Sequence, residues 1–303
     1  MEKRGGNKRR MLETAYALPF VVPGLILAAV FVLWPMVMSL RLAVSNYQIV
    51  QHTMTFTGLQ NFVALFTDPQ RRFWYAYRNN LLYAIATIPF ILFFGLLFAS
   101  LVNGLKRGRG FFRVAFYLPV ITSWIIVGLV FQYLFNSNGR GFINYIMVDK
   151  LNILKSYVPW LLQEWTGNMA IWIMGIWKNV GWAMIIYLAA LQGIAPDYYE
   201  AAVIDGASRA RCFFQITLPL VKPTTFFILV NMLIGSFGVF LQVLLLTGGD
   251  PAGKTSSLQY MLYDKAFNQF QFGQGAAIGL ITAVTIFVIT MLCNRWLTPK
   301  GEG

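Results

Sequence analysis

Six stretches of this sequence, each about twenty residues long, are built almost entirely from apolar side chains. They run over Ala15–Leu40, Asn79–Val102, Val114–Phe135, Met169–Leu191, Thr224–Leu246 and Ala276–Trp296. A helix of ~20 residues crosses the ~30 Å hydrocarbon core of a bilayer. Only 12% of the 303 residues are charged, against about 25% in typical soluble domains. The sequence therefore predicts an all-α membrane protein with six transmembrane helices in a single polytopic domain over residues 1–303.

Lys and Arg are unevenly distributed between the two sets of loops that these spans define. One set is dense in basic residues, in the segments 3–10, 106–113, 209–222 and 295–300. The opposite set is longer and more dilute. Because cytoplasmic loops carry the excess of basic residues, we expect the dense set and both termini on the cytoplasmic side. The net charge of +13 is then explained by topology, and no recognition motif indicates nucleic acid.

A polar, helix-forming segment separates the fourth span from the fifth. Pro196 can begin a helix because its missing N–H needs no partner there, and Glu200–Ala202 are strong helix formers. Gly206 permits a tight bend. A second helix, Arg209–Ile216, is expected to end at Leu218-Pro219. Two short helices joined at a bend would enter a groove on another protein, or, as an alternative, lie on the lipid surface.

Enzyme and metal chemistry find no support in the residue inventory. The single histidine, His52, lies in an outer loop, so no His-rich metal site and no Ser/His pair at membrane depth can form. Cys212 and Cys293 both fall on the cytoplasmic side, where a disulfide is not expected. No Asp or Glu lies inside a span, which disfavours an ion-driven secondary transporter. We expect no catalytic residue and no bound metal, and a channel or structural subunit would not need the loop around Glu200.

The spacing in that loop resembles the EAA loop of permease subunits in binding-protein-dependent ATP-binding-cassette importers. The family pattern is Glu-Ala-Ala, three residues, Gly, nine residues, then Ile-x-Leu-Pro, and residues 200–219 follow it without a gap. The resemblance implies that this loop, about residues 192–223, couples the chain to an ATPase subunit. The coupling residues it implies are Glu200, Ala201, Ala202, Asp205, Gly206, Ala207, Ile216, Leu218 and Pro219.

Two outer segments are similar to those of sugar-type permeases. They are Gly58–Pro69 and Thr247–Leu258, the latter departing at Asp250, where many relatives keep a glycine. The resemblance, to the maltose-permease or glycerol-3-phosphate-permease type, implies a type I importer permease fold in a bacterial or archaeal inner membrane. It also implies a second homologous permease, two ATPase subunits and an extracytoplasmic solute-binding protein as partners. No Walker-type phosphate loop occurs here, so ATP and Mg are expected on the ATPase subunits and no cofactor on this chain.

Polar side chains inside spans are costly in lipid and therefore mark candidates for a substrate pathway. The candidates are Lys178, Asn179, Asn231, Ser236, Gln242 and Trp177. Lys178 could instead extend its ammonium group to the membrane surface, and Asn231 and Ser236 could join helices. Amide and hydroxyl groups with aromatic faces such as Trp124 would suit a small neutral sugar. A glycerol phosphate or related polyol phosphate, the alternative substrate, would need unpaired cations in the pathway.

Overall fold

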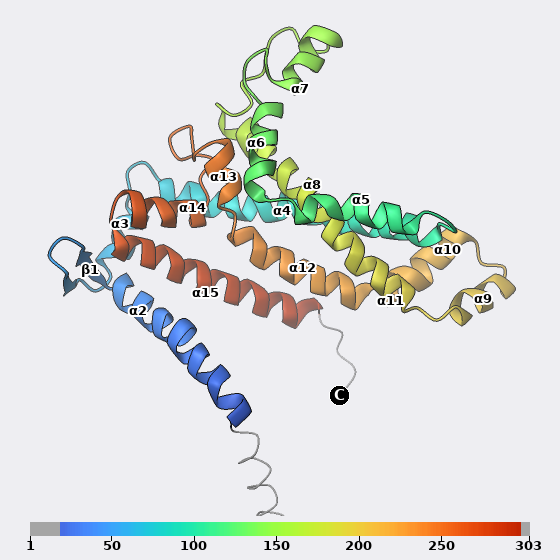
Figure 1. Ribbon diagram of the computed structural model, residues 1–303, viewed down its shortest axis with the longest axis horizontal. Coiled ribbons are helices and arrows are strands. Elements are labelled where there is room, and N and C mark those ends of the chain that lie inside the picture. Colours follow the sequence, from blue (N-terminus) through green and yellow to red (C-terminus); the bar gives the residue numbers. More distant parts are fainter. Residues whose placement is uncertain (1–18, 298–303) are drawn as a thin grey trace, which may run out of the picture.

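The structure, a computed structural model, describes residues 19–297. Four long helices lie side by side in Figure 1: α4 (Arg72–Gly104), α8 (Glu164–Gln192), α12 (Lys222–Phe237) and α15 (Phe272–Leu297). Helices α4 and α8 pack against each other most extensively, and a Cβ on Gly95 would lie 2.8 Å from Ala183 Cβ. Small residues at a crossing let two helix backbones approach where lipid supplies no hydrophobic drive for association.

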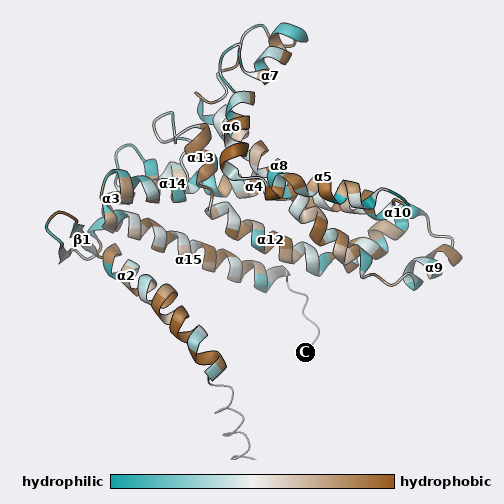
Figure 2. Ribbon diagram, in the orientation of Figure 1, coloured by the Kyte–Doolittle hydropathy of each residue, from teal (hydrophilic) through white to brown (hydrophobic). Residues whose placement is uncertain are grey.

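The first span diverges from this bundle. It covers Pro19–Ala43, with a π-helical turn η1 (Ala29–Leu33) leading into α2 (Trp34–Ala43). None of its most apolar window is buried inside the chain, and Figure 2 shows apolar residues over most of its length. Residues 15–18 of the predicted span, and the basic residues at positions 3–10 and Lys300, lie outside the described residues.

Both ends of the bundle carry short elements. At one end lie the antiparallel strands β1 (Ser45–Gln48) and β2 (Thr53–Phe56), with α3 (Gln60–Phe66) and α14 (Leu258–Tyr263), followed by η4 (Asp264–Asn268). At the opposite end lie α9 (Asp197–Ile204) and α10 (Arg209–Cys212). The predicted topology likewise separates the segment Gly58–Pro69 from the loop around Glu200 by the full depth of the membrane.

The second, fourth and sixth predicted spans are confirmed as continuous helices, which are nine, six and five residues longer than expected. The third and fifth are not single helices, which corrects the prediction. The third is α5 (Arg109–Ile121) and α6 (Trp124–Leu134), bent by 91°. Between them Thr122 and Ser123 are extended, and Ser123 accepts a hydrogen bond from Ile125 N as the cap of α6. A short polar pair can interrupt a span when its side chains satisfy the freed backbone groups.

The fifth apolar stretch is also divided between two helices. Helix α12 ends at Phe237, and α13 (Leu241–Leu246) begins after residues 238–240. The Gln242 side-chain oxygen accepts a hydrogen bond from Phe240 N at 3.2 Å, which satisfies a backbone donor at the start of α13. Within the described residues, four helices are long and apolar enough to span a membrane, or six segments if each of two bent pairs counts as one span. The second bent pair is Arg209–Leu220 with Lys222–Phe237, bent by 60°.

The loop between α13 and α14 is fastened to α4 by two neighbouring asparagines. Asn79 donates to the carbonyl oxygens of Lys254 and Ser256 at 2.7 and 2.8 Å. Asn80, 1% exposed, donates to Ser236 O at 2.6 Å and accepts from Leu258 N at 2.8 Å. The loop is therefore held against α4 by two buried side chains.

We expect Asn80→Leu to destabilise the protein by about 2 kcal/mol, because it leaves a buried N–H and a buried C=O without partners. Thermal unfolding in detergent and protease cleavage within residues 247–257 would measure the loss. Asn231→Leu is the matched control, since Asn231 is exposed and donates only to Phe227 O of its own helix. Equal stability of the two variants would contradict the assigned role of Asn80.

Candidate functional site

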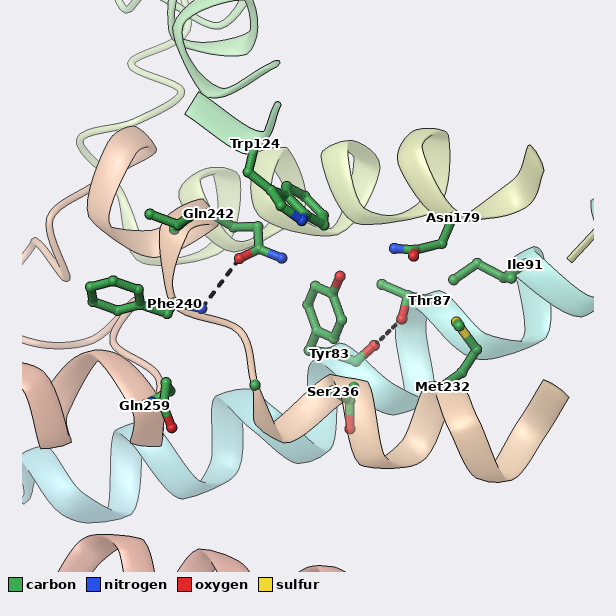
Figure 3. Close-up of a pocket in the computed structure, with 13 residues that line it drawn as sticks. Tyr83, Thr87, Ile91, Trp124, Asn179, Met232, Ser236, Phe240, Gln242 and Gln259 are labelled. Carbon is green, nitrogen blue, oxygen red and sulfur yellow. Dashed lines mark hydrogen bonds between the residues drawn. The ribbon is translucent and has the colours of Figure 1, made fainter. Parts of the chain in front are cut away.

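A cavity of about 610 Å³ opens where the two interrupted spans meet α4 and α8. Trp124, the first residue of α6, forms one side, and the break before α13 forms another (Figure 3). The break before α13 brings non-helical residues, Gly238 and Phe240, to the cavity wall, as occurs in membrane proteins where such backbone lines a binding site. The thirteen residues that line it are Tyr83, Thr87, Ile91, Trp124, Asn179, Met232, Gly235, Ser236, Gly238, Phe240, Leu241, Gln242 and Gln259.

The lining combines aromatic rings with neutral hydrogen-bonding groups. Figure 3 shows the Tyr83 hydroxyl and the amides of Asn179 and Gln242 directed toward the space below the Trp124 ring. Two of the polar side chains are fixed by hydrogen bonds to backbone carbonyls of their own helices. Asn179 Nδ2 donates to Gly175 O at 2.8 Å, and Thr87 Oγ1 donates to Tyr83 O at 2.7 Å. None of the thirteen lining residues is charged. Such a surface suits a neutral molecule that carries several hydroxyl groups.

The structure brings together half of the pathway residues expected from the sequence. Asn179, Ser236 and Gln242 line the cavity. Trp177 instead lines a separate apolar cavity of about 550 Å³ beside Phe116 and Pro119. Asn231 is exposed. Lys178 is 5% exposed and hydrogen-bonded to backbone carbonyls rather than extended to the membrane surface.

Sequence reasoning missed Tyr83, Thr87, Met232 and Gln259. Tyr83 and Thr87 are four residues apart on α4, so they share one helix face, but nothing in the sequence distinguishes that face. The glycines at 235 and 238 were an available signal, because paired glycines inside an apolar span often mark an interruption at a binding site. They would have located the break in the fifth span, although not its distance from Trp124.

The loop around Glu200 folds as two short helices joined by a left-handed glycine, as predicted. Gly206 has φ +72°, Ala207 N donates to Ala202 O at 2.8 Å, and Gly206 N donates to Val203 O at 3.0 Å. These two bonds form the Schellman arrangement that closes a helix end around a glycine. Ser208 then accepts a hydrogen bond from Arg211 N as the cap of α10.

The second half of the loop differs from the prediction in one respect. The chain stays helical beyond Ile216, through η3 (Phe213–Thr217) and α11 (Leu218–Leu220), and turns only at Val221, where α12 begins at a 60° angle. Pro219 lies in the first turn of α11, directly after the π-helical turn η3. Leu218-Pro219 therefore continues the helical path and does not end it.

Large apolar side chains are exposed on this loop. Ile204 is 86% exposed and Val203 68% exposed, next to Gly206. The Glu200 carboxylate is exposed and has no hydrogen bond or ion pair within the described part of the chain. The two halves of the loop are joined by Tyr199, whose hydroxyl lies 2.9 Å from Thr217 Oγ1 in η3. Exposed apolar side chains beside an unpaired acid are typical of a surface that a partner covers.

A family model described as "Binding-protein-dependent transport system inner membrane component" matches residues 60–301. The chain is 31% identical to the probable ABC transporter permease protein YurN of Bacillus subtilis, over 93% of this chain and 96% of that protein. It is 31% identical to the arabinooligosaccharides transport system permease protein AraP of Halalkalibacterium halodurans, over 98% of this chain and 91% of that protein. Among solved structures, it is similar to a chain of a bacterial ABC transporter involved in the import of the acidic polysaccharide alginate. That chain has a TM-score of 0.81 and 26% identity, with 100% of both chains covered.

Proposed function

We propose that the cavity is part of the path of a carbohydrate through the membrane. The chain belongs to the family of binding-protein-dependent transport system inner membrane components and is a permease subunit of an ABC importer. The carrying observation is the uncharged, aromatic and amide-rich lining at the meeting of two interrupted spans. Sugars bind through their hydroxyl groups to amides and hydroxyls, and through their apolar faces to aromatic rings. The names of the AraP relative and of the similar alginate transporter also refer to the transport of saccharides.

The glycerol phosphate alternative is less well supported by the same lining. A phosphate monoester carries about 1.5 to 2 negative charges at neutral pH and forms its strongest hydrogen bonds with the charged side chains of Arg and Lys. The residues around the cavity include no Arg or Lys. A path that selects a phosphate ester would be expected to expose at least one cation to the substrate.

The direct test measures uptake of three radiolabelled compounds, arabinotriose, an alginate trisaccharide and glycerol 3-phosphate. The importer is reconstituted in vesicles with its binding protein, second permease and ATPase subunits. We expect uptake of a saccharide, and a tenfold or greater rise in its KM for Trp124→Ala, about 1.4 kcal/mol of lost binding. Trp177→Ala is the control, because Trp177 faces the separate apolar cavity. Uptake of glycerol 3-phosphate alone would overturn the carbohydrate assignment.

We further propose the assembly in which this chain works. Two ATPase subunits, which hold ATP and Mg, would bind the loop around Glu200 and that of the second permease. A solute-binding protein would dock at the opposite end, near β1, β2 and α3, and both termini of this chain would be cytoplasmic. Closure of the ATPase dimer would then move the two loops and bias the spans between inward-open and outward-open states.

Glu200→Ala is expected to lower coupled uptake about tenfold, a coupling loss of ~1.4 kcal/mol, with little change in stability. The reason is that the Glu200 carboxylate forms no hydrogen bond or ion pair within the described chain, so its removal costs the fold little. Uptake and binding-protein-stimulated ATP hydrolysis measure the effect. Asp197→Ala, an exposed acid in the first turn of the same helix, is the control. Wild-type coupling in the Glu200 variant would remove that residue from the interface.

A further inference from the structure

We propose that Lys178 is a positioning residue for the cavity. Its ammonium group holds the bend between α5 and α6, and through that bend it places the Trp124 ring on the cavity wall. The proposal rests on the proposed function in one respect, namely that the cavity is the substrate path. Lys178 itself is not among the residues that line the cavity.

The contacts of Lys178 account for all of its hydrogen-bonding capacity. Nζ donates to Pro119 O at 2.8 Å, to Val120 O at 3.2 Å and to Thr122 O at 2.5 Å. A lysine ammonium group has three N–H donors, so none remains for a substrate. With the residue 5% exposed, its charge is satisfied inside the protein and does not reach the membrane surface.

The three carbonyls are those that the interruption leaves without helical partners. Helix α5 ends at Ile121, and α6 starts again at Trp124 after a 91° turn. The last carbonyls of a helix are unpaired and carry partial negative charge, so a cation is favoured there. In a membrane each unsatisfied carbonyl would cost several kcal/mol. A single lysine from α8 therefore completes the C-terminus of α5.

No carboxylate forms an ion pair with Lys178 among the described residues. The two ion pairs within residues 19–297 both end on Glu164, at 2.5 Å from Arg78 and 3.8 Å from Lys254. The counter-charge for Lys178 is thus the end of α5 together with the face of an aromatic ring. The ammonium group and the bend between α5 and α6 therefore stabilise each other.

Trp124 connects that bend to the cavity. Lys178 Nζ lies 4.7 Å from the centre of the Trp124 ring, within the range of a cation–π interaction. The ring lines the cavity, and Figure 3 shows it above Tyr83 and Thr87. Lys178 therefore lies behind the ring, and a change at Lys178 would reach a substrate by moving Trp124.

The test compares Lys178→Met, which keeps a long apolar stem but removes the donors and the charge, with Lys178→Arg, which keeps both. Uptake of arabinotriose, the alginate trisaccharide and glycerol 3-phosphate is measured in the complete reconstituted importer. For the compound that is transported, we expect Lys178→Met to raise KM about tenfold with kcat within about twofold, and Lys178→Arg to restore KM to within about threefold. The double variant Lys178→Met/Trp124→Ala should be no worse than Trp124→Ala alone, since Lys178 acts through that ring.

A second readout needs no transported compound. The importer is labelled with 5-fluorotryptophan, and the ¹⁹F resonance of Trp124 is assigned as the one lost in Trp124→Phe. We expect this resonance to shift or broaden in Lys178→Met and to return in Lys178→Arg. An unchanged resonance in Lys178→Met, or additive losses in the double variant, would overturn the positioning role. If Trp124→Ala changes KM for none of the three compounds, the proposed path fails, and the ¹⁹F signal still decides whether Lys178 positions Trp124.

Discussion

Replacement of Gly206 by Asp is expected to reduce ATP-driven uptake about a hundredfold or more, which corresponds to ~2.7 kcal/mol of lost coupling. Gly206 has φ +72° and closes α9 through the two hydrogen bonds around it. A Cβ at this position would meet nothing within 4 Å in the described chain. The new carboxylate would therefore project away from the permease, beside the exposed side chains of Val203 and Ile204. If an ATPase subunit covers that surface, an unpaired charge would be buried in the interface.

Backbone strain alone does not produce so large an effect. A non-glycine residue at such a helix end costs about 1 kcal/mol, and Asp adopts the left-handed conformation more readily than most residues. Gly108→Asp separates the effect of backbone strain from the effect of the interface. Gly108 also has a positive φ, +83°, and an added Cβ there would meet no described atom within 4 Å. It lies in another loop, however, directly before α5. Uptake, ATP hydrolysis and the amount of assembled complex should be measured for both variants. Similar losses in both, or normal uptake in the Gly206 variant, would contradict the proposed interface.

The features that the sequence predicted well depend on local chemistry. The Glu200 loop is fixed by residues close to one another, with Gly206 placed where a helix must end in a left-handed turn. The spans around α4, α8 and α15 follow from long apolar runs whose backbone groups bond only within the helix. For these elements, composition and spacing contain most of the information that the fold uses.

The cavity could not be predicted in the same way, because it depends on contacts between distant segments. Lys178 is the clearest case, since from the sequence it was a candidate to face the substrate or to extend to the membrane surface. The observed position depends on three carbonyls 56 to 59 residues earlier. Those carbonyls are free only because the third span is interrupted, and apolar composition is the same for a continuous helix and an interrupted one. The break at Thr122-Ser123 and the role of Lys178 therefore had to be found together.

Gly181→Ala is expected to be the most destabilising single-methyl change in the bundle, at about 3 kcal/mol or more, the upper part of the range for overpacked cores. Gly181 lies on α8, one turn beyond Lys178, where α8 passes α5. A Cβ on Gly181 would lie within van der Waals overlap of the Phe116 carbonyl oxygen, at 1.9 Å. Because a backbone oxygen cannot rotate away, α5 would have to move from α8 and weaken the three bonds made by Lys178.

Two other glycines serve as controls for the overlap with a backbone atom. At Gly175 the nearest atom to an added Cβ is the Tyr83 hydroxyl, 2.0 Å away, and that side chain can turn into the adjacent cavity, so Gly175→Ala should cost less. An added Cβ at Gly235, in α12, would meet no atom of the described residues within 4 Å, so Gly235→Ala should be neutral or stabilise the helix by up to ~1 kcal/mol. Thermal unfolding in detergent ranks the three. If Gly181→Ala proved as stable as Gly235→Ala, α5 would not be pressed against α8, and Lys178 could not hold the bend from its observed position.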